Sequence, residues 1–250
     1  MVSLLTTFSL LVSSCKEKSS APANHEIEQW SANDIMQKAH QRAGGKIWQN
    51  PESLTLIGRG IFYRGSDTSF HESHKMWRVY ESSKEEAHSA NGKVRIESIK
   101  EGKPVFIVSY DGQNTYDLSG KQEKSAADKR WASNFGFGVI RHAFDEGYTL
   151  EKAGEGIIKS RKTYRIKVID KVEGETIFDI DQENFDILGV AFDTPRGWHE
   201  RHYSNFFTKD EYSWRQSGLV ELFYEGKKAN DIIWEDFDIN QKLPDSLFIL

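Results

Sequence analysis

The sequence predicts a mainly β domain whose antiparallel sheet forms a barrel or a strongly curled sheet. Apolar and polar residues alternate in about eleven short runs. Turn dipeptides such as Asp111-Gly112 and Glu225-Gly226 separate these runs at the spacing of hairpins. No segment between the runs has the length of a crossover helix, so the strands are expected to pair antiparallel.

The ordered part of the chain is expected to begin with a helix over residues 31–43. Ser31 and Asp34 have the spacing of a capping box. Apolar residues then follow at helical intervals, and Gly44-Gly45 supplies the left-handed backbone that often ends a helix.

The first predicted strand covers residues 54–63, with Leu54, Leu56 and Phe62 on one face. Gly58 and Gly60 lie on the same face and indicate a bend or a close backbone approach. Later strand-like runs cover residues 76–80, 94–99, 105–110, 115–118, 163–169, 176–181, 188–192, 200–207, 212–214, 219–224 and 232–239.

One apolar segment, residues 125–144, does not alternate as a strand would. The i, i+4 spacing of Trp131 and Phe135 predicts a partly helical insert, and Gly136 and Gly138 exclude a long helix. Such a segment between two groups of strands would suit the cover of an open barrel mouth.

The N-terminal fifteen residues have an uncharged apolar run that ends at Cys15, the only cysteine of the chain. The run matches the apolar region of a signal peptide and is too short to span a bilayer. Val12-Ser13-Ser14-Cys15 resembles a bacterial lipobox, which implies acylation of Cys15 and attachment to a membrane. The predicted organisation is a signal peptide and lipobox over 1–15, a flexible tether over 16–30 and a single domain over 31–250.

Composition and motifs exclude several kinds of function. The net charge of −5 offers no basic field for nucleic acid. The chain has no Gly-x-Ser-x-Gly motif and no glycine-rich phosphate loop. We therefore expect no enzymatic activity, no catalytic residue and no cofactor.

Two histidine pairs are weak candidates for metal binding. His199 and His202 would point to opposite faces of a strand, and His71 and His74 are expected in a loop without a third ligand. We therefore predict no metal site. Five aspartates that could act as acid and base are expected on a solvated sheet face, namely Asp179, Asp181, Asp186, Asp236 and Asp238.

Three blocks of sequence resemble one family. They are the segment 39–45 with Trp48 and the strand 54–63, the aromatic insert around 134–137, and the C-terminal segment 218–248. Together they are similar to the lipoprotein-carrier superfamily typified by LolA and LolB, in its branch of Bacteroidetes outer-membrane lipoproteins. The resemblance implies a half-open antiparallel barrel of about eleven strands, covered by helical lid segments, with an apolar cavity that takes acyl chains.

The leading hypothesis is a lipoprotein anchored in the outer membrane that binds a lipid or the acyl chains of other lipoproteins without chemistry. Trp131, Phe135, Phe137 and Ile140 are the predicted ligand-binding residues. The alternative is a protein-interaction scaffold in the cell envelope whose barrel interior is filled by its own side chains. A cavity or a packed interior would distinguish the two.

Overall fold

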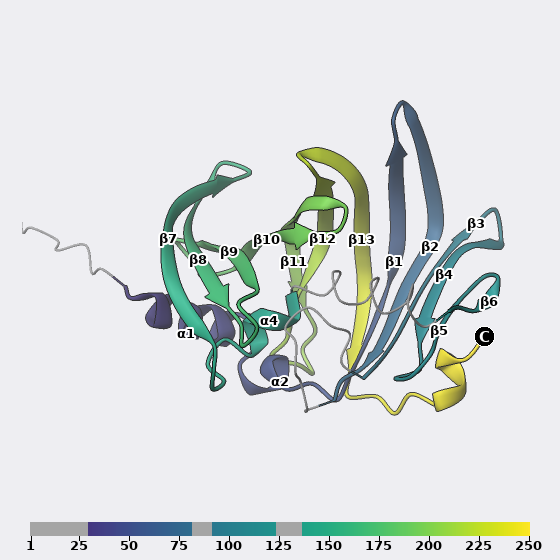
Figure 1. Cartoon of the computed structure of the whole chain (residues 1–250), viewed down its shortest axis with the longest axis horizontal. Coiled ribbons are helices and arrows are strands. Elements are labelled where there is room, and N and C mark those ends of the chain that lie inside the picture. Colours follow the sequence, from purple (N-terminus) through teal and green to yellow (C-terminus); the bar gives the residue numbers. More distant parts are fainter. Residues whose placement is uncertain (1–29, 82–91, 124–136) are drawn as a thin grey trace, which may run out of the picture.

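The computed structural model describes residues 30–81, 92–123 and 137–250. Within these residues, thirteen strands form one sheet in the order β6-β5-β4-β3-β2-β1-β13-β12-β11-β10-β9-β8-β7. Neighbouring strands pair antiparallel, and β6 and β7 form the two edges of the sheet. Figure 1 shows the sheet as an open curl, with β7 and β6 at opposite ends. The predicted half-open antiparallel barrel is confirmed.

The sheet consists of two runs of hairpins that meet at its middle. The chain passes from β1 outward to β6, continues at the opposite edge with β7, and returns strand by strand to β13, which pairs with β1. The strands are β1 (Ser53–Arg64), β2 (Asp67–Val79), β3 (Lys93–Lys100), β4 (Lys103–Tyr110), β5 (Thr115–Asp117), β6 (Gly120–Lys121), β7 (Thr149–Ile158), β8 (Arg161–Ile169), β9 (Glu175–Asp181), β10 (Ile187–Thr194), β11 (Gly197–Thr208), β12 (Arg215–Tyr224) and β13 (Lys227–Ile239).

Three helices lie together near one end of the curl (Figure 1): α1 (Ala32–Ala43), α2 (Lys46–Gln49) and α4 (Phe137–Arg141). Helix α1 contacts β7 and β8 and also β12, which is several strands away in the sheet. The sheet must therefore wrap around this helix. A 3₁₀ turn, η1 (Asp245–Phe248), packs on β3 near the other edge.

Helix α1 has the predicted ends. The Asp34 amide donates to the Ser31 hydroxyl at 3.1 Å, and the Ser31 amide donates to the Asp34 carboxylate at 3.0 Å. Gly44 and Gly45 both have positive φ where the helix stops. The apolar face is fully buried, with Ile35 and Met36 in the main core.

Gly58 permits a close approach of β1 to β13. A Cβ at this position would lie 1.9 Å from the carbonyl oxygen of Ile233. The register of β1 also shifts beside Gly58 on both sides, against β13 and against β2. The predicted close backbone approach is confirmed, and these bulges bend the sheet in its middle.

Some predicted strands were wrong. Residues 212–214 form part of the loop between β11 and β12, where the Trp214 side chain is buried. Strand β2 begins at Asp67, well before the predicted residue 76, because it continues the long hairpin with β1. Strand β7 was missed, since its residues are mostly polar or glycine and mostly exposed, as an edge strand allows.

Candidate functional site

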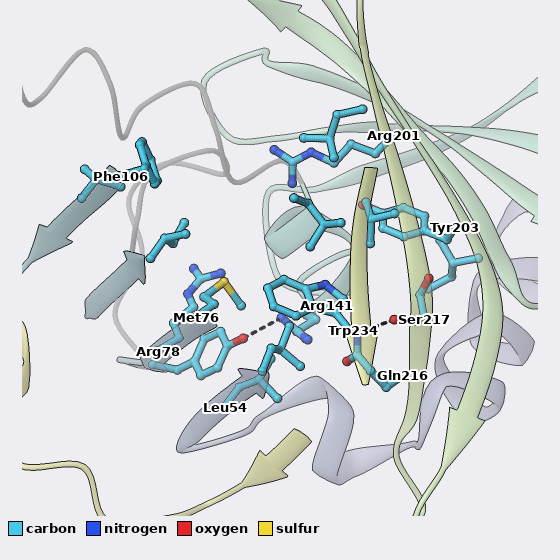
Figure 2. Close-up of a pocket in the computed structure, with 18 of the residues that line it drawn as sticks. Leu54, Met76, Arg78, Phe106, Arg141, Arg201, Tyr203, Gln216, Ser217 and Trp234 are labelled. Atoms are coloured by element: carbon cyan, nitrogen blue, oxygen red, sulfur yellow. Dashed lines mark hydrogen bonds between the residues drawn. The ribbon is translucent and has the colours of Figure 1, made fainter. Parts of the chain in front are cut away.

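The curled sheet and the helices enclose a cavity of about 900 Å³. This is within the size range of small-molecule sites, which hold about 300–1000 Å³. Its walls come from β1–β4 on one side and β11–β13 on the other, with two residues of α1 and one each of α2 and α4 at one end. Figure 2 shows Met76 and Phe106 on the first wall and Tyr203 on the second.

A row of apolar side chains crosses the first wall in register. Leu56 of β1 pairs with Met76 of β2, Met76 with Ile96 of β3, and Ile96 with Val108 of β4. All four residues line the cavity. Because side chains at paired positions lie on the same face of a sheet, the row forms a continuous apolar strip inside the curl.

Apolar residues of the wall are also open to solvent. Val105 and Phe106 of β4 are each 42% exposed, and Leu118, after β5, is 55% exposed, yet all three line the cavity. Large hydrophobic side chains gathered at an open concave surface are typical of binding sites. This part of the cavity is therefore accessible and apolar.

Charge is also present, and it is mostly positive. Among the described residues that line the cavity, six are arginines and two are aspartates. Asp186 accepts hydrogen bonds from Arg42 Nε and from Arg215 Nε, each at 2.8 Å. These bonds hold the pKa of Asp186 below its ordinary value although burial raises it. This carboxylate connects α1 to β12.

Three of the other four arginines converge on the cavity from different elements: Arg78 of β2, Arg141 of α4 and Arg201 of β11. Arg78 and Arg141 are buried. Arg78 and Arg141 flank Tyr80, with their guanidinium carbons 4.5 and 5.3 Å from its ring centroid. Figure 2 shows Arg201 directed into the space between the two walls.

The electrostatics show that these three arginines interact. Burial lowers the pKa of Arg78, and the positive charges of Arg141 and Arg201 lower it further. Burial raises the pKa of Tyr80, but Arg141 and Arg78 outweigh this and lower it overall. Burial raises the pKa of Tyr203 to about 12, against the opposing effect of Arg201. The three guanidiniums therefore share one positive region.

The predicted ligand-binding residues lie only partly within the described chain. Cys15, Trp131 and Phe135 are outside the described residues. Phe137 is the first residue of α4. Ile140 is fully buried in the core, where His40 Nε2 donates to its carbonyl oxygen at 2.5 Å, and it does not line the cavity. Their role in binding stays a prediction.

Sequence reasoning missed the arginines of the cavity. Arg78 follows Met76 by two residues and pairs with Leu54, so it occupies an inward position of the alternating pattern. A charge at such a position is a usable signal, because charged side chains are seldom buried without a reason. It can be recognised once the register of the strand is known.

The histidine pairs differ in environment. His199 is buried and His202 half-buried, on opposite faces as predicted. Burial, with help from Arg201, lowers the pKa of His199 to about 3. His71 and His74 were wrongly expected in a loop. They lie on β2, where the bulge opposite Gly58 and Gly60 buries both, and Phe62 packs against both rings.

The aspartates are not all solvated, contrary to expectation. Asp179, Asp181 and Asp186 are buried and bind arginines, whereas Asp236 and Asp238 are half-exposed beside Lys209.

Among the described residues, no three His, Cys, Asp or Glu side chains are grouped to hold a metal ion. Within those same ranges, no helix is both long and apolar enough to span a membrane.

Comparison with known proteins identifies the fold. No family model and no curated protein sequence matches this chain. A LolA superfamily protein from Nitrosomonas europaea superimposes with a TM-score of 0.52 at 12% identity, covering 88% of this chain and 98% of that one. The fold is that of the LolA superfamily.

Two further structures agree with this LolA-type fold. A domain from Vibrio parahaemolyticus, described as an outer membrane lipoprotein-sorting protein, has a TM-score of 0.50 at 12% identity, covering 87% of this chain and 95% of that one. A DUF1329 family protein from Desulfovibrio piger has a TM-score of 0.50 at 10% identity with the same coverage. The predicted resemblance to the lipoprotein-carrier fold is confirmed.

Proposed function

We propose that this protein is a lipid-anchored lipoprotein of the cell envelope that binds a hydrophobic ligand in its barrel cavity. The ligand is a lipid or the acyl chains of a lipoprotein, and the protein carries or receives it without catalysis. One observation carries the proposal: the concave face encloses about 900 Å³ and presents an apolar strip that is open at Phe106 and Leu118.

The cavity favours a carrier over the alternative scaffold. A scaffold with a filled interior would use side chains such as Leu56 and Val108 to pack the curl solidly. Here those side chains line a cavity instead. Each methylene of a ligand that enters this space contributes about 0.8 kcal/mol of transfer free energy before ordering costs. A long acyl chain can therefore bind through burial alone.

The anchor and the cover are parts of the same proposal. Acylation of Cys15 would hold the domain at the outer membrane through residues 16–30, where its ligand and any protein partners of the envelope are found. Trp131, Phe135 and Phe137 would line or close the cavity, whereas Ile140, also predicted to bind the ligand, is buried in the core and would hold α4 in place. The LolA-type fold supports this assignment, since the solved domain from Vibrio parahaemolyticus is described as a lipoprotein-sorting protein.

Uptake of a fluorescent fatty acid by the purified domain tests the proposal. Phe106→Asp places a charge on the apolar rim and should weaken binding by about tenfold or more. Phe70→Asp is the matched control, because Phe70 is 51% exposed on β2 and does not line the cavity. Equal loss in both variants, or no uptake by the wild-type protein, would refute binding in the cavity.

A further inference from the structure

The cavity has polar and apolar regions that lie side by side. Arg78 of β2 pairs with Val94 of β3. Two residues earlier on β2, Met76 pairs with Ile96, which in turn pairs with Val108. The inward side chain next to Arg78 on its own strand is Met76. The apolar strip therefore begins beside the guanidinium of Arg78 and extends across β3 and β4 toward the rim.

Protein groups hold the arginines of the cavity in place. Arg42 and Arg215 bind the Asp186 carboxylate. Arg141 donates to the Trp48 carbonyl oxygen at 2.8 Å and to the Tyr80 hydroxyl at 3.4 Å. Arg201 Nε donates to His199 Nε2 at 2.8 Å, and the low pKa of His199 means that this imidazole is neutral.

Positive charges held together at a buried site destabilise one another. Arg141 and Arg201 lower the pKa of Arg78, and an anion placed among the guanidiniums would offset this repulsion. Guanidinium groups bind carboxylate and phosphate oxygens through paired, charge-assisted hydrogen bonds. Tyr80 and Tyr203 line the same cavity and add two hydroxyls that can form hydrogen bonds.

We propose that the ligand is an anionic amphiphile whose carboxylate or phosphate head binds at Arg78, Arg141 and Arg201. Its chain lies along the strip formed by Leu56, Met76, Ile96 and Val108 and leaves toward Phe106. This inference rests on the proposed function and specifies its ligand class. Head and chain contribute separately, since the head binds by charge and the chain by burial.

Four probes separate these contributions: palmitate, hexadecyl phosphate, hexadecanol and inorganic phosphate. The first three carry chains of equal length, and the last carries the anion alone. Each is measured as a competitor of a bound fluorescent fatty acid on the wild-type protein. The two anionic amphiphiles should compete at least about tenfold better than hexadecanol, as expected for charge-assisted hydrogen bonds in a buried site.

Arg78→Gln and Arg201→Gln should each remove this preference by weakening the anionic amphiphiles while hexadecanol competes as before. Arg59→Gln is the matched control, because it removes the same charge from a guanidinium that pairs with Glu235 at the exposed surface. Arg141 is left intact because it also anchors α4 to α2. The stronger of palmitate and hexadecyl phosphate identifies the head group.

The outcomes distinguish this inference from the function on which it rests. Equal competition by hexadecanol and palmitate would overturn the anionic head and leave the apolar carrier intact. Displacement by inorganic phosphate as effective as by hexadecyl phosphate would overturn it too, because the site would then bind a small anion. Failure of every amphiphile to compete would overturn both proposals.

Discussion

The guanidinium of Arg141 lies 4.8 Å from the ring centroid of Trp48, and its Nε donates to the carbonyl oxygen of the same residue at 2.8 Å. Trp48 belongs to α2 and Arg141 to α4, so one side chain joins two helices that are distant in the sequence. The same guanidinium also lies 5.3 Å from the ring centroid of Trp214. The contact fixes the helical end of the cavity.

Arg141→Met should therefore loosen α4 while the sheet stays folded. Loss of a buried charge-assisted hydrogen bond costs about 1–3 kcal/mol. Amide hydrogen exchange should speed up in α4 and α2 before it changes in the central strands β1 and β13. Unchanged exchange in α4 would show that the helix is held by other contacts.

The Asp186 carboxylate gives a second prediction. Asp186→Asn leaves Arg42 and Arg215 without their shared anion, and we expect a loss of about 1–3 kcal/mol in the free energy of unfolding, since both arginines are partly exposed. Asp236→Asn removes a surface pair with Lys209 and should cost less than about 1 kcal/mol. Urea denaturation measures both, and a larger loss for Asp236→Asn would contradict the assignment.

Gly58 offers a test of the bend in the sheet. Gly58→Ala must displace backbone, because the new Cβ would meet the Ile233 carbonyl oxygen at 1.9 Å, and should cost about 2–4 kcal/mol. A Cβ at Gly65 would meet no atom within 4 Å, but Gly65 has a positive φ that an alanine adopts only with strain. Gly65→Ala should therefore cost about 1 kcal/mol. If thermal or urea unfolding finds the two variants equally stable, the β1–β13 contact is looser than described.

Two buried histidines predict how stability depends on pH. Burial lowers the pKa of His74 to about 4 and that of His199 to about 3, from 6.5. Between these values and 6.5 the unfolded chain binds protons that the folded protein does not bind. The free energy of unfolding is therefore highest above about pH 6.5 and falls as the pH drops toward 4. The slope is about 1.4 kcal/mol per pH unit for each proton.

Unfolding in urea across this range tests the prediction, with His199→Phe as the comparison. In this variant the free energy of unfolding should depend less steeply on pH, by about 1.4 kcal/mol per pH unit, whatever its absolute stability. A slope unchanged by the substitution would mean that His199 titrates normally in the folded protein.

The sequence predicted the fold well where local patterns carry it. The Ser31–Asp34 capping box and the Glu225-Gly226 turn depend on neighbouring residues, and both are present. Strand β7 was missed because an edge strand that pairs only with β8 in the described chain needs no apolar alternation. The bulge that buries both His71 and His74 depends on β1, so spacing within β2 alone could not reveal it.

The candidate site was harder to predict, because its members come from opposite walls. Arg78 and Arg201 are distant in the sequence and line the same cavity only because the sheet curls. The apolar insert was the more conspicuous sequence feature, and it directed attention to Phe135 and Phe137. Aspartate at both positions should abolish uptake of a fluorescent fatty acid while the β circular dichroism is retained; unchanged uptake would remove these two residues from the site.

Native mass spectrometry of the purified wild-type protein tests the central claim most directly. The account predicts a population heavier than the polypeptide by the mass of an amphiphile, which organic extraction removes and added fatty acid restores. A protein that shows only its polypeptide mass, and gains none with excess fatty acid, would contradict the existence of a ligand cavity on the concave face of the sheet.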